Sequence, residues 1–169
     1  MLSETPRWVA VYTNPRAEKR VALRLGEQSI ENYLPLRREK RHWSDRIKVV
    51  EEPLFRSYIF AKIEKTQLDS LRNVDGVVYV VSFKGEIATI PDEQIEAVRR
   101  AVETDEKLYI HQSSLLRKGA TVIVQEGPFA QMKGTIVSNC RDGNFAIHID
   151  ALSLSLVAEI DKNLLTPVE

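Results

Sequence analysis

The chain has 169 residues, which is enough to bury a core in one or two modest domains without disulfides. Its 24 basic and 24 acidic residues cancel, so the overall charge points to neither nucleic acid nor a membrane surface as a partner. No apolar run approaches the roughly 18 residues of a membrane helix. The start, MLSETPRW, lacks the basic and apolar regions of a signal peptide. We therefore expect no membrane association.

The sequence offers no motif of catalysis or metal binding. The three histidines are far apart, and none has a cysteine or histidine at ligand spacing. Cys140 is the only cysteine, so no internal disulfide forms and a cytoplasmic location fits best. We interpret Cys140 as a structural thiol rather than a nucleophile. The prediction is a binding protein, not an enzyme, without metal or other cofactor.

Two apolar stretches in the first half, WVAVYT and SYIFAKI, predict strands. The residues that share one strand face are Trp8, Ala10 and Tyr12 in the first, and Tyr58 and Phe60 in the second. Most aromatic residues in such strands belong to a core. A sheet with helices on one side cannot cover both faces, however, so this face is either core or an interface with a partner.

Residues 14–28 predict a helix, with Asn14 as its N-cap and Pro15 at its first position. Three arginines at intervals of four residues share one face of this helix: Arg16, Arg20 and Arg24. Like charges at this spacing destabilise an isolated helix by about 0.2–0.5 kcal/mol per pair. Bound phosphates would reverse that cost. The face is either solvated or a nucleic-acid contact, and we favour the contact.

Residues 33–55 predict a long charged hairpin around a WSDR tip. Residues 7–48 carry 11 basic and 5 acidic residues, so this half of the N-terminal region is locally basic. Trp43 at the tip can stack on a nucleic-acid base. We therefore add Arg41, Trp43 and Arg46 to the expected nucleic-acid-binding residues.

A second, short helix is predicted over residues 66–76, with Thr66 and Asp69 as a capping box and Gly76 as its stop. Further strands follow, and Pro91 opens a third, amphipathic helix. The order of elements predicts an α+β N-terminal domain, an antiparallel sheet flanked by helices.

Apolar periodicity is lost over residues 104–115, which predict a linker between domains at 1–103 and 116–169. After Arg117, five short alternating strands separated by turns predict a small all-β barrel. The β-branched run TVIV favours strand over helix, and the Gly-Pro that follows it interrupts any helix. The turn within EGPFAQMKG leaves Phe129 either as a plug over the barrel end or as a contact for a partner.

Three stretches carry a family resemblance. KGATVIVQEGPFAQMKGTIVSN resembles the KOW motif, whose fold is an SH3-like barrel. WVAVYTNPRAEKRVALRL and EEPLFRSYIFAKI resemble the N-terminal domain of NusG-type transcription elongation factors. The likeness runs in order across nearly the whole chain. The hairpin RHWSDRIKVVEEPLF most resembles specialised RfaH-like paralogues, which antiterminate polysaccharide operons.

The resemblance implies a factor that binds RNA polymerase through its N-terminal domain and suppresses pausing or termination. It implies that the KOW domain recruits a ribosomal protein or a termination factor, which favours Phe129 as a partner contact. Arg20 and Arg24 match a basic patch that contacts non-template DNA. The polymerase-binding residues that the resemblance implies are Trp8, Ala10, Tyr12, Phe60, Gln67 and Ser70.

The chain departs from the family pattern in two places. Asn14 and Asp75 stand where a relative is basic, which puts that relative's DNA sequence preference in doubt here. The usual Phe-Pro-Gly/Asn-Tyr corner is Phe-Arg-Ser-Tyr at residues 55–58, so we expect that turn to differ.

A ribosome-associated or RNA-binding KOW protein is the alternative function. Such a protein would present basic residues on its barrel. Residues 113–169 hold five basic against six acidic residues, which counts against RNA binding through the barrel.

Overall fold

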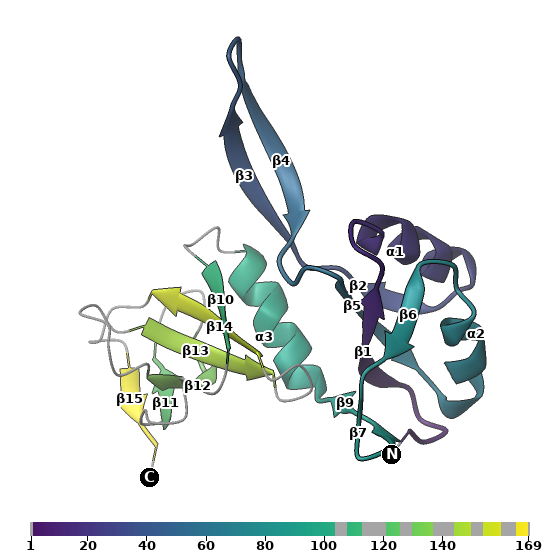
Figure 1. Cartoon of the computed structure of the whole chain (residues 1–169). Coiled ribbons are helices and arrows are strands. Elements are labelled where there is room, and N and C mark those ends of the chain that lie inside the picture. Colours follow the sequence, from purple (N-terminus) through teal and green to yellow (C-terminus); the bar gives the residue numbers. More distant parts are fainter. Residues whose placement is uncertain are drawn as a thin grey trace. The chain divides into compact units, whose positions relative to one another are not determined.

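The computed structural model describes residues 2–103, 108–112, 121–125, 130–136, 144–149, 154–159 and 165–168 (Figure 1). The chain divides into two compact units, Met1–Ile90 and Pro91–Glu169. Phe129 and Cys140 lie outside the described residues, so the expectations about them stay predictions. Within the described residues, no helix is long and apolar enough to cross a membrane.

The first unit is built on an antiparallel sheet of strand order β2-β5-β1-β6, and β9 also pairs with β1. The strands are β1 (Arg7–Thr13), β2 (Glu31–Tyr33), β5 (Tyr58–Ile63), β6 (Val77–Val80) and β9 (Thr89–Ile90). The two strands predicted from WVAVYT and SYIFAKI are the central pair β1 and β5 of this sheet.

Two helices, α1 (Glu18–Glu27) and α2 (Leu68–Arg72), cover one face of this sheet (Figure 1). Val21 of α1 and Leu71 of α2 are fully buried in one cluster with Val9 and Val11 of β1. Each such side chain contributes about 1.5–3 kcal/mol to folding. The predicted arrangement of an antiparallel sheet with helices against it is confirmed for this unit.

Helix α1 begins three residues later than the sequence predicted. Asn14 and Ala17 close a turn, in which the Ala17 N–H donates to the Asn14 carbonyl at 3.0 Å, and Ala17 is the N-cap. Arg16 has a φ of 63°, outside the helical region. Proline suits the second position of a turn whose third residue has positive φ. Pro15 therefore precedes the helix, and the prediction of Asn14 as N-cap is wrong.

The second helical segment is also capped differently from the prediction. A 3₁₀ turn, η1 (Lys65–Gln67), leads into α2, and the capping box joins Glu64 and Gln67. The Glu64 N–H donates to Oε1 of Gln67 at 3.0 Å. The predicted box of Thr66 and Asp69 is wrong because the capping side chains lie two residues earlier.

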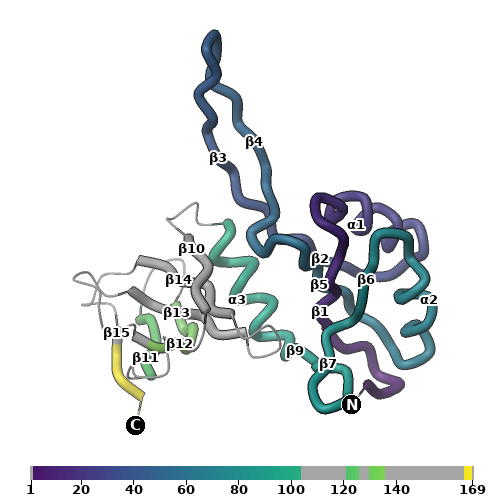
Figure 2. Tube along the Cα trace, in the orientation of Figure 1, coloured from purple at the N-terminus to yellow at the C-terminus, as the bar shows by residue number. Residues whose placement is uncertain are grey.

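A long hairpin of β3 (Leu36–His42) and β4 (Ile47–Pro53) projects from the first unit (Figures 1 and 2). At its tip the Trp43 N–H donates to the Arg46 carbonyl at 2.8 Å, which confirms the predicted WSDR turn. A small hairpin of β7 (Ser82–Phe83) and β8 (Glu86–Ile87) completes the unit.

The second unit contains α3 (Asp92–Glu103) and an antiparallel sheet of order β10-β14-β13-β12-β11-β15. Its strands are β10 (Leu108–Gln112), β11 (Thr121–Val124), β12 (Lys133–Ile136), β13 (Asn144–Ile149), β14 (Leu154–Glu159) and β15 (Leu165–Pro167). The five strands predicted after Arg117 are present as β11 to β15. Two elements of this unit differ from the sequence prediction.

Those differences concern α3 and β10. The sequence predicted a domain over residues 1–103 that includes α3, and α3 lies in the compact unit Pro91–Glu169. The predicted domain bounds stay a prediction. Part of the predicted linker forms β10, which pairs with β14. Helical periodicity shows that Ile95 and Val98 are buried, but it does not show which sheet covers them.

Candidate functional site: a tyrosine ladder and a basic groove

The face of the first sheet opposite α1 and α2 carries the predicted aromatic residues. Cross-strand pairing places three residues of β1 on this face beside three of β5: Trp8 beside Lys62, Ala10 beside Phe60, and Tyr12 beside Tyr58. The sequence predicted a shared face within each strand, and the pairing of β1 with β5 brings the two sets together on one face of the sheet.

Three tyrosines from adjacent strands form a row across this face, which we call the tyrosine ladder: Tyr58, Tyr12 and Tyr79. Tyr12 stands edge-on to Tyr58, with ring centroids 5.2 Å apart, and stacks on Tyr79 at 4.8 Å. Such ring pairs contribute about 0.5–1.5 kcal/mol beyond their buried area. Tyr79 is 47% exposed, while Tyr12 and Tyr58 are half-buried.

The surroundings of Tyr58 in the tyrosine ladder raise the pKa of its hydroxyl group. Burial raises the pKa of Tyr58 above its usual value of 10.0, and the charge of Tyr79, a hydrogen bond to Tyr79 and the charge of Tyr12 raise it further. Tyr58 therefore stays neutral at pH 7. The ladder presents aromatic rings with polar hydroxyl groups, a combination suited to an interface.

The other predicted residues on this face are buried. Trp8 is 3% exposed, and the ammonium group of Lys62 lies 5.7 Å from its ring centroid. Phe60 is fully buried and packs edge-on against Phe55 at 5.7 Å. Ala10 is fully buried as well. Of the four residues predicted here, Tyr12 is the one that keeps accessible surface.

Sequence reasoning did not select Tyr58 and Tyr79 for this site. The alternation of SYIFAKI already places Tyr58 beside Phe60, so that signal was available. The position of Tyr79 depends on the pairing of β6 with β1, which shifts between Tyr12 and Thr13. A single sequence does not reveal such a shift.

The predicted contacts at Gln67 and Ser70 lie around the start of α2. The side chain of Gln67 accepts the Glu64 N–H and thereby serves the helix cap. Ser70 is exposed on α2. Gln67 is the last residue of η1, and Ser70 lies in α2.

The predicted basic face of α1 does not persist as three equivalent arginines. Arg16 lies in the turn before the helix, and Arg20 is exposed. Arg24 is half-buried, forms an ion pair with Oδ2 of Asp75 at 2.8 Å, and donates to the Asp75 carbonyl at 2.7 Å. The charge of Arg24 is therefore paired with that of Asp75, unlike the charges of Arg16 and Arg20 in the described contacts.

The turn at residues 55–58 keeps the geometry that we expected to change. The Tyr58 N–H donates to the Phe55 carbonyl at 3.1 Å, and Ser57 has a φ of 64°. A turn with proline second and glycine or asparagine third has positive φ at the same position. Arg56 and Ser57 therefore occupy a turn of the family type, and the expectation of a different turn is wrong.

This turn is fastened to the turn before α1. The Ser57 N–H donates to Oε1 of Glu18 at 2.7 Å, and the Thr13 N–H donates to the Ser57 carbonyl at 2.8 Å. Glu18 is 5% exposed. Its carboxylate accepts a charge-assisted hydrogen bond, which is the usual way for a buried carboxylate to be tolerated.

The two turns and the base of the long hairpin enclose a groove of about 650 Å³, which we call the basic groove. It is lined by Pro15, Arg16, Glu18, Lys19, Arg41, Val50, Glu51, Glu52, Pro53, Arg56 and Ser57. Two predicted nucleic-acid-binding residues, Arg16 and Arg41, meet in this groove. Arg56 and Lys19 line it too, although sequence reasoning assigned them no role.

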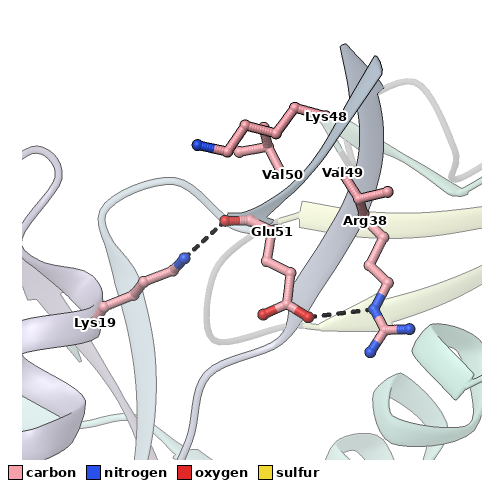
Figure 3. Close-up of a pocket in the computed structure, with 6 residues that line it drawn as sticks. All are labelled: Lys19, Arg38, Lys48, Val49, Val50 and Glu51. Atoms are coloured by element: carbon pink, nitrogen blue, oxygen red, sulfur yellow. Dashed lines mark hydrogen bonds and ion pairs between the residues drawn. The ribbon is translucent and has the colours of Figure 1, made fainter. Parts of the chain in front are cut away.

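A second depression of about 470 Å³ lies on the hairpin and shares Lys19, Val50 and Glu51 with the basic groove. Lys19 donates from Nζ to the Glu51 carbonyl at 2.8 Å, and the Glu51 carboxylate pairs with Nε of Arg38 at 3.2 Å (Figure 3). In Figure 3, the ammonium groups of Lys19 and Lys48 lie on one side of β4 and the guanidinium group of Arg38 on the other.

The hairpin tip carries the other predicted nucleic-acid contacts. Trp43 is 56% exposed, and the ammonium group of Lys48 lies 5.9 Å from its ring centroid. Arg46 is exposed beside it. The tip therefore combines an accessible aromatic ring with cations, as proteins that stack nucleic-acid bases do.

Comparisons with known proteins agree with this architecture. The family model described as transcription termination factor nusG matches residues 6–99, which is more than half of the chain. The solved structure titled "Domain interaction in Thermotoga maritima NusG" is 17% identical, with a TM-score of 0.55, and the match covers 97% of this chain and 98% of that one. At this identity the structural match bears on the fold alone.

Two structures of the MjSpt4:Spt5 complex, conformations A and B, also match. Each is 16% identical with a TM-score of 0.31; the matches cover 96% of this chain and 98% and 97% of those chains, respectively. A TM-score this low adds no argument. The comparison with curated proteins finds no significant match. Because the family model matches more than half of this chain, the chain belongs to the NusG family.

Proposed function

We propose that the protein is a transcription elongation and antitermination factor that binds RNA polymerase through its first unit. Membership of the NusG family supports a role in transcription. The observation that carries the proposal is the tyrosine ladder, because it gives the uncovered part of the first sheet a surface suited to a protein partner.

The ladder supports binding for a physical reason. Tyrosine is enriched in protein interfaces because it supplies a large, rigid ring together with a hydroxyl group. Stacking on Tyr79 and the edge-on contact with Tyr58 hold the ring of Tyr12 in place before any partner arrives. A preorganised ring loses less entropy on binding. Trp8, Ala10 and Phe60 form the buried floor of the same face.

Nucleic acid is a second proposed partner. Arg16 and Arg41 line the basic groove, and Trp43 and Arg46 stand at the hairpin tip. In an elongation complex the exposed non-template DNA strand is the nucleic acid of matching chemistry. Gln67 and Ser70 remain proposed polymerase contacts.

The finer assignments rest on the sequence. We propose that residues 116–169 form a KOW barrel that recruits a ribosomal protein or a termination factor, with Phe129 as a contact. The presence of strands β11 to β15 supports this proposal. The charged hairpin supports a specialised, RfaH-like role in a particular operon. A protein acting on RNA polymerase works in the cytoplasm, which suits a chain with a single cysteine.

Transcription in vitro tests this function. RNA polymerase is walked across a template with a strong pause, with and without the full chain, and the pause half-life is measured. We expect the wild type to shorten the pause and Tyr12→Ala/Tyr79→Ala to lose that effect. Phe83→Ala is the matched control, because Phe83 is an exposed aromatic residue outside the ladder. A wild type without effect, or a fully active double variant, would contradict the proposal.

A further inference from the structure

We propose that one face of the long hairpin is a second docking surface for RNA polymerase, separate from the tyrosine ladder. It contacts a polymerase surface that combines apolar with acidic side chains. We call it the hairpin apolar face, and it consists of Arg38, Lys40 and His42 of β3 with Ile47, Val49 and Glu51 of β4. This inference rests on the polymerase binding proposed above.

The two faces of the hairpin differ in chemistry. Ile47 and Val49 alternate with Lys48 along β4, so they point to the opposite face from Lys48. Lys48 is the cross-strand partner of Arg41, and its ammonium group lies 5.9 Å from the centroid of the Trp43 ring. The nucleic-acid contacts proposed for the hairpin therefore use the face of Lys48 and leave the hairpin apolar face open to another partner.

The hairpin apolar face exposes two large apolar side chains. Ile47 is 61% exposed and Val49 is 54% exposed. β3 and β4 pair only with each other, as a two-stranded sheet, and such a ribbon has no second layer in which to bury its side chains. Strand formation does not require apolar residues at these positions, because threonine favours strands as well. The exposed apolar surface is therefore better explained by a protein contact.

The charges around this surface indicate the chemistry of the partner. Lys40 is exposed and, within the described residues, takes part in no ion pair. The carboxylate of Glu51 is paired with Nε of Arg38 at 3.2 Å. A second copy of the chain would bring two such basic faces together, and a phosphate backbone would not bury Ile47 and Val49. An acidic protein surface with apolar side chains suits both features.

The reach of the hairpin favours the polymerase as that protein. Each strand has 7 residues, so the hairpin extends by about 23 Å from the body of the first unit (Figures 1 and 2). Its base is fixed, because the Leu54 N–H donates to the Pro35 carbonyl at 2.8 Å and Nζ of Lys19 donates to the Glu51 carbonyl at 2.8 Å.

A fixed arm of this length reaches a polymerase surface beyond the one that the tyrosine ladder contacts. Once the ladder is bound, the hairpin binds within the same complex, at a high effective concentration. A weak second contact of this kind therefore increases the affinity of the whole chain.

The experiment measures the affinity of the full chain for core RNA polymerase without nucleic acid. The central variant is Ile47→Thr/Val49→Thr, which replaces apolar surface by hydroxyl groups and keeps the β-branched side chains that favour a strand. Lys40→Glu reverses the unpaired charge and decides the test if the double variant does not fold. Val78→Thr is the matched control, because Val78 is an exposed valine of β6, outside the hairpin.

A second measurement locates the contact. The photoreactive residue benzoylphenylalanine replaces Val49 in one variant and Lys48, on the opposite face, in another. Each variant is irradiated in complex with core RNA polymerase, and the cross-linked segments are identified by mass spectrometry.

We expect Ile47→Thr/Val49→Thr to bind polymerase about tenfold more weakly, because apolar groups buried in the contact are lost. Lys40→Glu should also weaken binding, and more strongly at low salt than at high salt. Val78→Thr should bind as the wild type does. Position 49 should cross-link to a polymerase segment that contains acidic residues, and position 48 should not.

Wild-type affinity of the folded double variant, or of Lys40→Glu if the double variant does not fold, overturns the inference and leaves the tyrosine ladder as the polymerase contact. Cross-links from position 49 only within the chain or to a second copy overturn it as well. A double variant that loses affinity for a DNA oligonucleotide, but not for polymerase, would instead assign this face to nucleic acid. A wild type that does not bind polymerase overturns the proposed function itself.

Discussion

The carboxylate of Glu18 and the backbone N–H of Ser57, 39 residues apart in the chain, are joined by a hydrogen bond of 2.7 Å. This bond connects the first turn of α1 to the turn that leads into β5. It holds Ser57 at positive φ and sets the separation of the two turns that border the basic groove. A single buried side chain thus supports both the fold and the proposed binding site.

Removing the carboxylate should destabilise the first unit. In Glu18→Ala the part-buried Ser57 N–H loses its acceptor. An unsatisfied donor costs about 1–3 kcal/mol when fully buried, so we expect a loss near the lower end of that range. Glu18→Gln keeps an acceptor oxygen and should lose less. Urea denaturation gives the free energies of unfolding, and equal stability of wild type and Glu18→Ala would contradict this role.

A methyl group at Gly76 should be costly for two separate reasons. Gly76 has a φ of 98°, and an added Cβ would lie 2.8 Å from Cγ2 of Val21, which is fully buried. The backbone strain costs about 1–2 kcal/mol, and overpacking adds about 1–3 kcal/mol. Gly85→Ala is the control, since Gly85 also has positive φ but has open space around it. Equal losses of stability in the two variants would show that the contact with Val21 is unimportant.

The tyrosine ladder predicts a loss of stability at high pH. The pKa of Tyr58 is raised in the folded state, so the folded protein keeps this proton at a pH where the unfolded chain releases it. The resulting stabilisation is full below about pH 10 and is lost as the pH rises through the folded pKa. Unfolding free energies measured from about pH 9 to 11 should fall less steeply in Tyr58→Phe. Parallel curves for the two proteins would refute the coupling.

The pairing of Arg24 with Asp75 suggests a way to increase nucleic-acid affinity. Asp75→Asn removes the negative charge and keeps the backbone carbonyl that accepts from Arg24. The ion pair is partly exposed and contributes at most about 1 kcal/mol, so the variant should stay folded. We expect it to bind DNA more tightly at low salt. Unchanged affinity for a fluorescently labelled DNA oligonucleotide would leave Arg24 with a structural role only.

The periodicity of apolar residues predicted the elements whose formation depends on neighbouring residues in the sequence. The alternation in WVAVYT and SYIFAKI gave the central strands and their two faces, because a strand buries every second residue. The start of α1 was missed because nothing in the letter sequence shows that Arg16 adopts a positive φ. The burial of Glu18 depends on a residue 39 positions away. Strand β10 was read as linker because its partner, β14, lies far along the chain.

The same limit explains the candidate sites. Periodicity placed Tyr12 on the correct face but did not show that Tyr79 stacks on it, since that contact requires the pairing of β1 with β6. The basic groove joins three separate segments through hydrogen bonds distant in sequence. Charge counting found Arg16 and Arg41 but gave no reason to single out Arg56.

The affinity of the full chain for core RNA polymerase, measured without nucleic acid, tests the central claim most directly. Phe60 is fully buried, and its truncation would cost about 3–5 kcal/mol of stability, so Tyr12→Ala/Tyr79→Ala is the informative variant. Loss of interface anchors worth about 2 kcal/mol or more should weaken binding at least about tenfold. Arg20→Ala should bind as the wild type does. A folded double variant with wild-type affinity would contradict the assignment of the tyrosine ladder as the polymerase-binding surface.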